Sequence, residues 1–234
     1  MFFEKTKKIS GFTLAEVLIT LSVIGVVAAI TIPSVMNRSS TLQYISALKK
    51  FHNTMQRISN SAIMEGKHLQ NWGWSKSDDN AEDIFKNYIE KRLRVVRYCG
   101  VATGQGCGSE YLGLDGKPAG NWDNDSTVKV AIVDGATMAF SVVGNCEEID
   151  ENVVEMCGEV MVDINGTIKP NKVGRDIFWF GYYSNGLFMP YNYEKTEEEI
   201  EAGCRAGADG KTCAAKIVKD GWIFKSDGSN KYPW

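Results

Sequence analysis

The stretch Gly11-Phe12-Thr13-Leu14-Ala15-Glu16 begins an apolar run that continues to Met36. A leader with three lysines, residues 1–10, precedes it, and Glu16 is the only charged residue between Gly11 and Arg38. An ordinary signal peptide carries its cleavage site after the apolar core. Here the candidate cleavage point, between Gly11 and Phe12, lies before the core. Cleavage there would leave the apolar segment on the mature chain.

The basic leader, Gly11, Phe12, Glu16 and Pro33 together resemble the class III signal of type IV prepilins and type II secretion pseudopilins, over residues 1–37. The resemblance implies cleavage between Gly11 and Phe12 and N-methylation of Phe12 by a prepilin peptidase and methyltransferase. It implies polymerisation with other pilin or pseudopilin subunits into a homo- or hetero-filament. It also implies a single-pass protein of the bacterial inner membrane, with its head outside the cytoplasm, that later enters an extracytoplasmic filament.

Glu16 is an ionisable group at membrane depth, where a charge costs about 2.5–3.5 kcal/mol and needs a partner. The α-amino group of Phe12 on a neighbouring subunit would serve, and the pair would fix the axial register of each incoming subunit. The alternative is a carboxylate that reaches the lipid headgroups and has no part in assembly. The complete motif around Glu16 favours the assembly role.

The run from Phe12 to Met36 is long enough, as a helix, to span a hydrocarbon core of about 30 Å. Gly25 and Pro33 interrupt it, which predicts a kink or a locally melted turn between them. Pilin-like subunits use such a melted stretch when they pack into a filament. Gly and Pro are also common in membrane helices generally, so a purely structural interpretation stays open.

Beyond Pro33, apolar residues recur every three or four positions, which predicts an amphipathic continuation of the helix that ends at Gly66. His52 lies at the margin of its apolar face, and we expect a structural imidazole there. The predicted organisation is a cleaved leader (1–11), a transmembrane and assembly helix (12–36), an amphipathic continuation (37–66) and a globular head (67–234).

The head mixes strand and helix patterns. Asp78, Asp79 or Asn80 can cap a second helix, and a Gly-rich stretch, residues 99–125, has no clear period. Asp134-Gly135 suits a type I′ turn in a hairpin over residues 127–143. Further strands are predicted at 159–164, 177–183 and 187–191, and helices after Thr196 and over 213–219. We therefore expect an α+β, pilin-like fold: a long helix packed on an antiparallel sheet with a disulfide-clasped periphery.

The charge and the cysteines restrict the environment of the head. The formal net charge is −3. Removing residues 1–11 takes away three lysines and one glutamate, a net of +2, which leaves −3 − 2 = −5. No basic patch of the density that nucleic-acid binding requires is present, so we expect no nucleic-acid partner. The six cysteines all follow the membrane segment: Cys99, Cys107, Cys146, Cys157, Cys204 and Cys213.

An even number of cysteines in an exported domain is typical of disulfides. The sequence separations suggest three local pairs: Cys99 with Cys107, Cys146 with Cys157, and Cys204 with Cys213. Metal binding is the rival interpretation. It is the weaker one, because no Cys-x-x-Cys motif occurs and the chain has only two histidines.

Asp163, Asn165 and Asp176 form the one oxygen-rich pattern that suggests a metal. An Asp-x-Asn-Gly turn can present carboxylate and amide oxygens to Ca²⁺. The EF-hand pattern is absent, and Asn165-Gly166 is equally suited to an ordinary turn. We expect no cofactor to be required, with calcium as the open alternative to a structural turn.

Enzymatic interpretations find little support. Gly104-x-Gly106-x-Gly108 lies outside a strand–helix context, and there is no phosphate-binding loop to power assembly. Two hypotheses remain. The first is a structural subunit, a pilin or pseudopilin that polymerises through its N-terminal helix. The second is a membrane-tethered or pilus-tip binding protein, an adhesin, which uses the same N-terminus mainly as an address.

Overall fold

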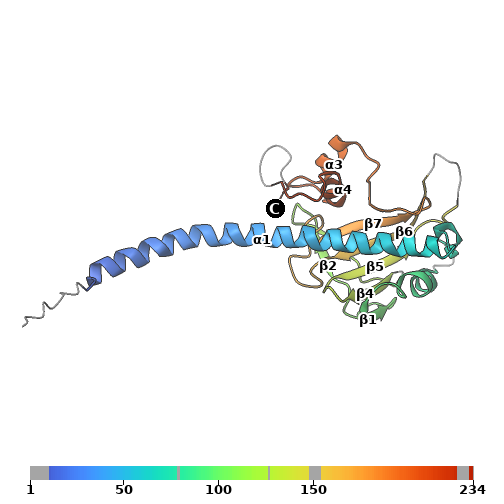
Figure 1. The fold of residues 1–234 in the computed structure, drawn as a ribbon, viewed down its shortest axis with the longest axis horizontal. Helices are drawn as coiled ribbons and strands as arrows, with labels where there is room; N and C mark the ends of the chain where they lie inside the picture. Colours follow the sequence, from blue (N-terminus) through green and yellow to red (C-terminus); the bar gives the residue numbers. More distant parts are fainter. Residues whose placement is uncertain (1–10, 78–79, 126, 148–153, 226–231, 234) are drawn as a thin grey trace, which may run out of the picture. The chain divides into compact units, whose positions relative to one another are not determined.

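The structure is a computed structural model that describes residues 11–77, 80–125, 127–147, 154–225 and 232–233 (Figure 1). The chain divides into two units, Met1–Ser40 and Thr41–Trp234. Each is described by itself. The helix α1 (Leu14–Met64) contributes to both units, and the sheets and all other helices belong to the second unit.

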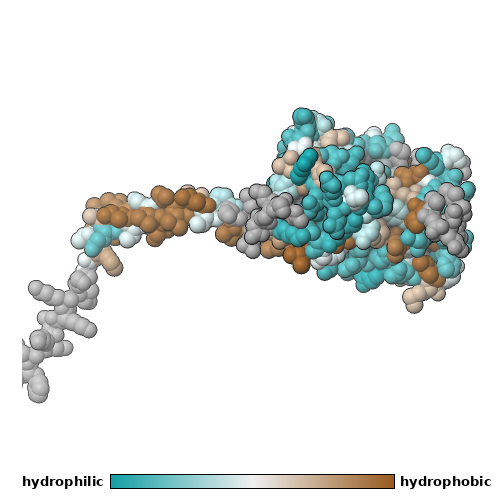
Figure 2. Space-filling view, turned by 90° about the horizontal axis from the view of Figure 1, so that it is seen from above, coloured by the Kyte–Doolittle hydropathy of each residue, from teal (hydrophilic) through white to brown (hydrophobic). Residues whose placement is uncertain are grey.

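The first unit contains the apolar part of α1. The segment Leu14–Pro33 is long and apolar enough to cross a membrane, and none of it is buried. Apolar side chains cover this part of the helix (Figure 2). A soluble monomer rarely exposes a continuous apolar surface of this kind, so a lipid or protein environment is required for it.

The helix α1 runs without interruption through Gly25 and Pro33. The described backbone of α1 therefore has no melted turn between these residues, and the predicted kink stays a prediction. A proline removes only one main-chain hydrogen bond, and its fixed φ is itself compatible with a helix, so the turns on either side can hold the helix together. Melting on packing into a filament stays a prediction.

The end of α1 agrees with the expected stop at Gly66. Gly66 has φ of +75°, its N–H donates to the carbonyl of Ile63 at 2.9 Å, and Lys67 N–H donates to the carbonyl of Ala62 at 2.8 Å. This pair of bonds is the Schellman motif, in which a left-handed glycine satisfies the last carbonyls of a helix.

The second unit is built on a six-stranded antiparallel sheet with the order β1-β4-β5-β6-β7-β8, beside a two-stranded sheet of β2 and β3. The fold is therefore α+β with a pilin-like arrangement, as expected. The strands are β1 (Val95–Gly100), β2 (Glu110–Leu112), β3 (Pro118–Asn121), β4 (Val128–Ile132), β5 (Thr137–Val142), β6 (Met156–Asp163), β7 (Ile177–Tyr183) and β8 (Phe188–Pro190). The remaining helical elements are η1 (Leu69–Trp72), α2 (Ala81–Ile84), η2 (Phe85–Ile89), α3 (Glu197–Gly203) and α4 (Cys213–Lys219).

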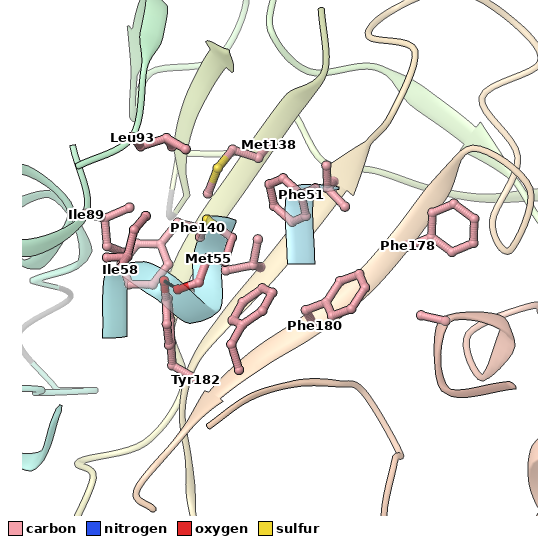
Figure 3. Close-up of a cluster of buried hydrophobic side chains, with 14 of the residues drawn as sticks. Phe51, Met55, Ile58, Ile89, Leu93, Met138, Phe140, Phe178, Phe180 and Tyr182 are labelled. Atoms are coloured by element: carbon pink, nitrogen blue, oxygen red, sulfur yellow. Dashed lines mark hydrogen bonds between the residues drawn. The ribbon is translucent and has the colours of Figure 1, made fainter. Parts of the chain in front are cut away.

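The amphipathic half of α1 packs on one face of the six-stranded sheet (Figure 3). Phe51 lies 6.2 Å, between ring centroids, from both Phe180 and Phe188, and Tyr182 donates a hydrogen bond to the carbonyl of Met55 at 3.2 Å. The predicted spacing of three and four is confirmed by the buried apolar residues of α1, which are Ile45, Leu48, Phe51, Met55, Ile58 and Ala62.

The opposite face of the sheet carries a smaller core. Alternation along β7 sends Phe180 and Tyr182 toward α1 and Trp179 toward the other face, where Tyr111 meets its ring edge-on at 5.6 Å. Trp122 is buried in the same cluster. The Gly-rich stretch 99–125 is thus not simply a loop, since it forms the ordered pair of strands β2 and β3 that covers this face.

Helix α1 also covers the edge of the sheet at β8. Phe188 N–H donates to Gln56 Oε1 at 2.8 Å, and the Phe188 carbonyl lies 2.8 Å from His52 Nε2. The half-buried imidazole of His52 therefore has a structural partner, as expected. At the other edge, β1 pairs with β4 through two irregularities in register, between Val95 and Arg97 and between Tyr98 and Gly100.

Two local predictions need correction. The β4–β5 hairpin does not have a type I′ turn, which requires positive φ at both central residues. Gly135 has φ of +86°, but Asp134 is not in the left-handed region. Ile132 instead accepts from Gly135 N at 3.0 Å and donates to Ala136 O at 2.9 Å, which defines a three-residue loop with a glycine bulge.

The second correction concerns the cap of α2. Asn80 is the N-cap residue, but its side chain does not cap the helix. Its amide nitrogen donates to the carbonyl of Gly73 at 2.6 Å, and its amide oxygen accepts from Ser75 N at 3.2 Å, so it closes the preceding loop. The other two proposed caps, Asp78 and Asp79, lie outside the described residues. The capping box between Thr196 and Glu199 is confirmed at α3.

Three disulfides hold the periphery of the head. They are Cys99–Cys107, Cys146–Cys157 and Cys204–Cys213, the same three pairs that the spacing suggests, and no described cysteine is free. All six cysteines are buried. Each disulfide spans a short stretch of sequence, so each restrains one local loop.

Candidate functional site

The N-terminal segment is the first candidate site, because its residues match the predicted processing and assembly positions. Phe12 follows Gly11 outside the helix, and its side chain is 88% exposed. Helix α1 begins two residues later, at Leu14. A peptidase could therefore reach the Gly11–Phe12 bond in extended chain, and the new amino group would lie next to the first helical turn.

Glu16 and Thr13 form a capping box at the start of α1. The carboxylate Oε2 accepts from Thr13 N and from Thr13 Oγ1, both at 2.8 Å. Thr13 Oγ1 in turn accepts from Glu16 N at 3.2 Å. The Thr-x-x-Glu pattern at residues 13–16 is the same pattern that predicts the α3 cap, and it is the sequence signal for this capping box.

The capping box changes the interpretation of Glu16. The carboxylate is not unpartnered in the single chain, because uncharged donors of Thr13 already bind one of its oxygens. These bonds satisfy the first helical turn but do not neutralise the charge. A cationic amino group from a second subunit would therefore still find a carboxylate that Thr13 holds in place.

The second candidate site lies at one end of the six-stranded sheet, where Asp163, Asn165 and Asp176 come together. Asp163 ends β6 and pairs with Ile177 at the start of β7, directly after Asp176. Ile164 N–H donates to the Asp176 carbonyl at 2.9 Å, and Asn165 N–H donates to Asp163 Oδ1 at 3.3 Å. The three residues that the sequence suggests therefore belong to one cluster.

Both carboxyl groups of this cluster are fully buried. Burial raises the pKa of Asp163 to about 8, and the charge of Asp176 adds to the effect. Burial also raises the pKa of Asp176, which main-chain N–H groups of Lys172 (2.5 Å) and Asn171 (3.0 Å) and the charge of Arg175 oppose. Neither carboxylate forms an ion pair with a side chain in the described part of the sequence.

Sequence reasoning missed two neighbours of this cluster. Thr137 lies opposite Asp163 in the β5–β6 ladder, and Asn171 is linked to Asp176 through its main chain. Over the described ranges, no group of three or more His, Cys, Asp or Glu side chains could hold a metal ion. Any cation at this place would therefore need amide, hydroxyl or main-chain oxygens besides the two carboxylates.

The third candidate is an open groove of about 510 Å³ along β7, β8 and the segment that follows. Its wall is mostly aromatic and aliphatic, and Glu194 is its one charged lining residue. It is lined by Val154, Met156, Tyr183, Asn185, Leu187, Met189, Tyr191, Asn192, Tyr193 and Glu194. Of the aromatic residues in β7, only Tyr183 lines this groove, and Phe180 and Tyr182 are buried under α1.

The chain has an exposed apolar helical segment, Leu14–Pro33, and an α+β head, an arrangement that fits a pilin-like fold. Residues 6–32 match the family model described as the prokaryotic N-terminal methylation motif. The chain thus carries an N-terminal signal consistent with the class III signal peptides of type IV pilins and pseudopilins. No curated protein and no solved structure matches the chain. The motif and the apolar helix are consistent with a membrane-anchored, structural protein of pilin type.

Proposed function

We propose that this protein is a filament subunit, a pilin or pseudopilin in a major or minor position, of a type IV pilus or a type II secretion pseudopilus. The observation that most supports this proposal is the exposed apolar segment Leu14–Pro33 of α1. It overlaps the methylation motif and has Glu16 as its single charged residue. A helix of this kind is stable in the inner membrane, where lipid surrounds it. It can then leave the lipid and pack against identical helices, because apolar side chains are stable in both environments.

Processing prepares the subunit for this exchange. A prepilin peptidase cuts between Gly11 and Phe12, removes the basic leader and methylates the new amino group of Phe12. The head stays outside the cytoplasm throughout. Glu16 then pairs with the Phe12 amino group of a neighbour, which sets the axial register, since an unpaired charge between packed apolar helices is costly.

Mass spectrometry of the protein from cells tests the proposal. The expected product begins at N-methylated Phe12. Replacing Gly11 with a bulky residue should block cleavage, whereas Gly11→Ala should slow it less, because a peptidase pocket built around glycine excludes larger side chains. A mature N-terminus downstream of Ala29 would show an ordinary signal peptide and would overturn the proposal.

The groove on β7 and β8 favours a second candidate function, a binding head at the tip of a filament or tethered to the membrane. Exposed Val154 and Leu187 lie in it beside the polar groups of Asn185, Asn192 and Glu194. An exposed apolar patch with polar groups around it is typical of a binding site. The variant Tyr191→Ala tests this function. Cells that still form filaments but no longer adhere would favour it, and cells that adhere as before would count against it.

A further inference from the structure

The cluster around Asp163 carries an unusual number of buried polar atoms without partners. Such atoms are rare in folded proteins, and each needs an explanation, such as an ion or an ordered water. Seven buried side-chain atoms have no hydrogen-bond partner among the described residues. Five of the seven belong to this one place: Thr137 Oγ1, Asp163 Oδ2, Asn165 Oδ1, Asn171 Oδ1 and Arg175 Nε.

The two amide side chains of the cluster form the same kind of hydrogen bond. Asn165 Nδ2 donates to the hydroxyl of Tyr44, and Asn171 Nδ2 donates to the hydroxyl of Ser109, each at 3.2 Å. In each amide, therefore, the nitrogen donates to a hydroxyl outside the cluster, and the oxygen has no hydrogen-bond partner among the described residues. An amide oxygen left free beside a buried carboxylate is an acceptor without a donor.

The charge of the cluster also favours a bound cation. Asp163 and Asp176 are both fully buried, and the negative charge of Asp176 disfavours the charged form of Asp163. Among the described residues, neither carboxylate has a cationic side chain at ion-pair distance. Burying uncompensated charge is expensive, and a bound cation would remove the deficit.

We propose that Asp163, Asn165, Asn171 and Asp176 bind one Ca²⁺ ion, with the hydroxyl of Thr137 beside them. Ca²⁺ takes six to eight oxygen ligands and accepts carboxylates, amide oxygens and main-chain carbonyls in irregular geometry. Mg²⁺ fits less well, because it demands a near-ideal octahedron and keeps its own water. Zn²⁺ prefers nitrogen and sulfur ligands, which this cluster lacks.

The site would join parts of the head that are distant in sequence. Tyr44 belongs to α1, Thr137 to β5, Asp163 to β6, and Asp176 precedes β7. Because Asn165 binds the ion through its oxygen and Tyr44 through its nitrogen, the ion would hold the first head-packing turn of α1 against the sheet. The site would then stabilise the whole head rather than a single loop.

Calcium binding can be measured on the full mature chain in detergent. After treatment with EDTA, samples receive CaCl₂, MgCl₂ or no metal, and thermal unfolding and retained calcium per chain are recorded. We expect one Ca²⁺ per chain and a rise in Tm of about 5–10 °C at a hundredfold excess over Kd, with a smaller rise for Mg²⁺. These measurements on the unaltered protein need no variant to fold.

Two matched variants locate the ion. Asp163→Asn keeps the side-chain shape and removes one charge, so it should fold but weaken Ca²⁺ binding by at least about tenfold and abolish the Tm rise. Asp134→Asn removes an exposed carboxylate that pairs with Lys50, and it should leave both readouts unchanged. Failure of the unaltered chain to retain Ca²⁺, or equal binding by Asp163→Asn, would overturn the proposal in favour of a turn that holds buried water.

Discussion

The carboxylate of Glu16 accepts hydrogen bonds from the main chain and the hydroxyl of Thr13 before any neighbour arrives. Glu16→Ala should therefore insert into the membrane at least as well, since it loses a cost of about 2.5–3.5 kcal/mol, and yet it should enter filaments poorly. Counting the subunit in membrane and in sheared filament fractions checks this. Glu198→Ala, an exposed change on α3, is the control. Normal incorporation of Glu16→Ala would leave Glu16 without an assembly role.

His52 gives the head a pH dependence. Burial lowers the pKa of its imidazole below the ordinary value, although the Phe188 carbonyl opposes this. The unfolded chain therefore binds the proton more readily than the folded one. The contribution of His52 to stability is complete above the unfolded pKa, about 6.5, and is lost as the pH falls through the folded value. Urea unfolding between about pH 7.5 and 5 should show a smaller loss for His52→Gln than for the unaltered protein. Equal losses would contradict this prediction.

At the level of elements, each disulfide restrains one local loop, although the cysteines of two of the three pairs also belong to the main buried core. Each closes a loop of roughly ten residues, for which the chain-entropy model gives about 2.5–2.8 kcal/mol. Replacing Cys146 and Cys157 by serine should lower the free energy of unfolding by about that amount and increase hydrogen exchange near β6, while α1 and β7 stay protected. Loss of protection throughout the sheet would show instead that the Cys146–Cys157 pair is needed for the core.

The elements differ in how far the sequence predicts them. Strong periodicity predicts the amphipathic half of α1, because one buried face imposes its spacing on the residues. The strands β6 and β7 are buried on both faces, so they appear in the sequence as apolar runs without such a spacing. The strands β2 and β3 have no such pattern, since their residues are largely exposed. Asp134-Gly135 fits two loop lengths, and only the pairing of Ile132 with Ala136 decides between them. Thr137 and Asn171 join the Asp163 cluster through the fold and could not be found from spacing.

At the scale of the whole molecule, we expect the two units to differ in solubility. The buried core begins at Ile45, so the unit Thr41–Trp234 contains all of it, whereas the apolar surface of Leu14–Pro33 has no cover. A chain that begins at Thr41 should be soluble without detergent and unfold cooperatively. The full chain should need detergent. Analytical ultracentrifugation and thermal unfolding check both, and a truncated chain that aggregates or melts without cooperativity would contradict this division.

Helix α1 covers the β8 edge of the sheet, and this affects how such subunits can associate. Sheet proteins commonly associate when one open edge accepts a strand from another chain. Here His52 and Gln56 occupy the outward main-chain groups of Phe188, Pro190 has no N–H to offer, and β1 at the far edge is irregular. The head is thus closed to a donated strand at the β8 border, and the bulged register of β1 makes the opposite border a less regular template. The proposed joining of copies through the apolar helix therefore does not require a strand to be added at β8.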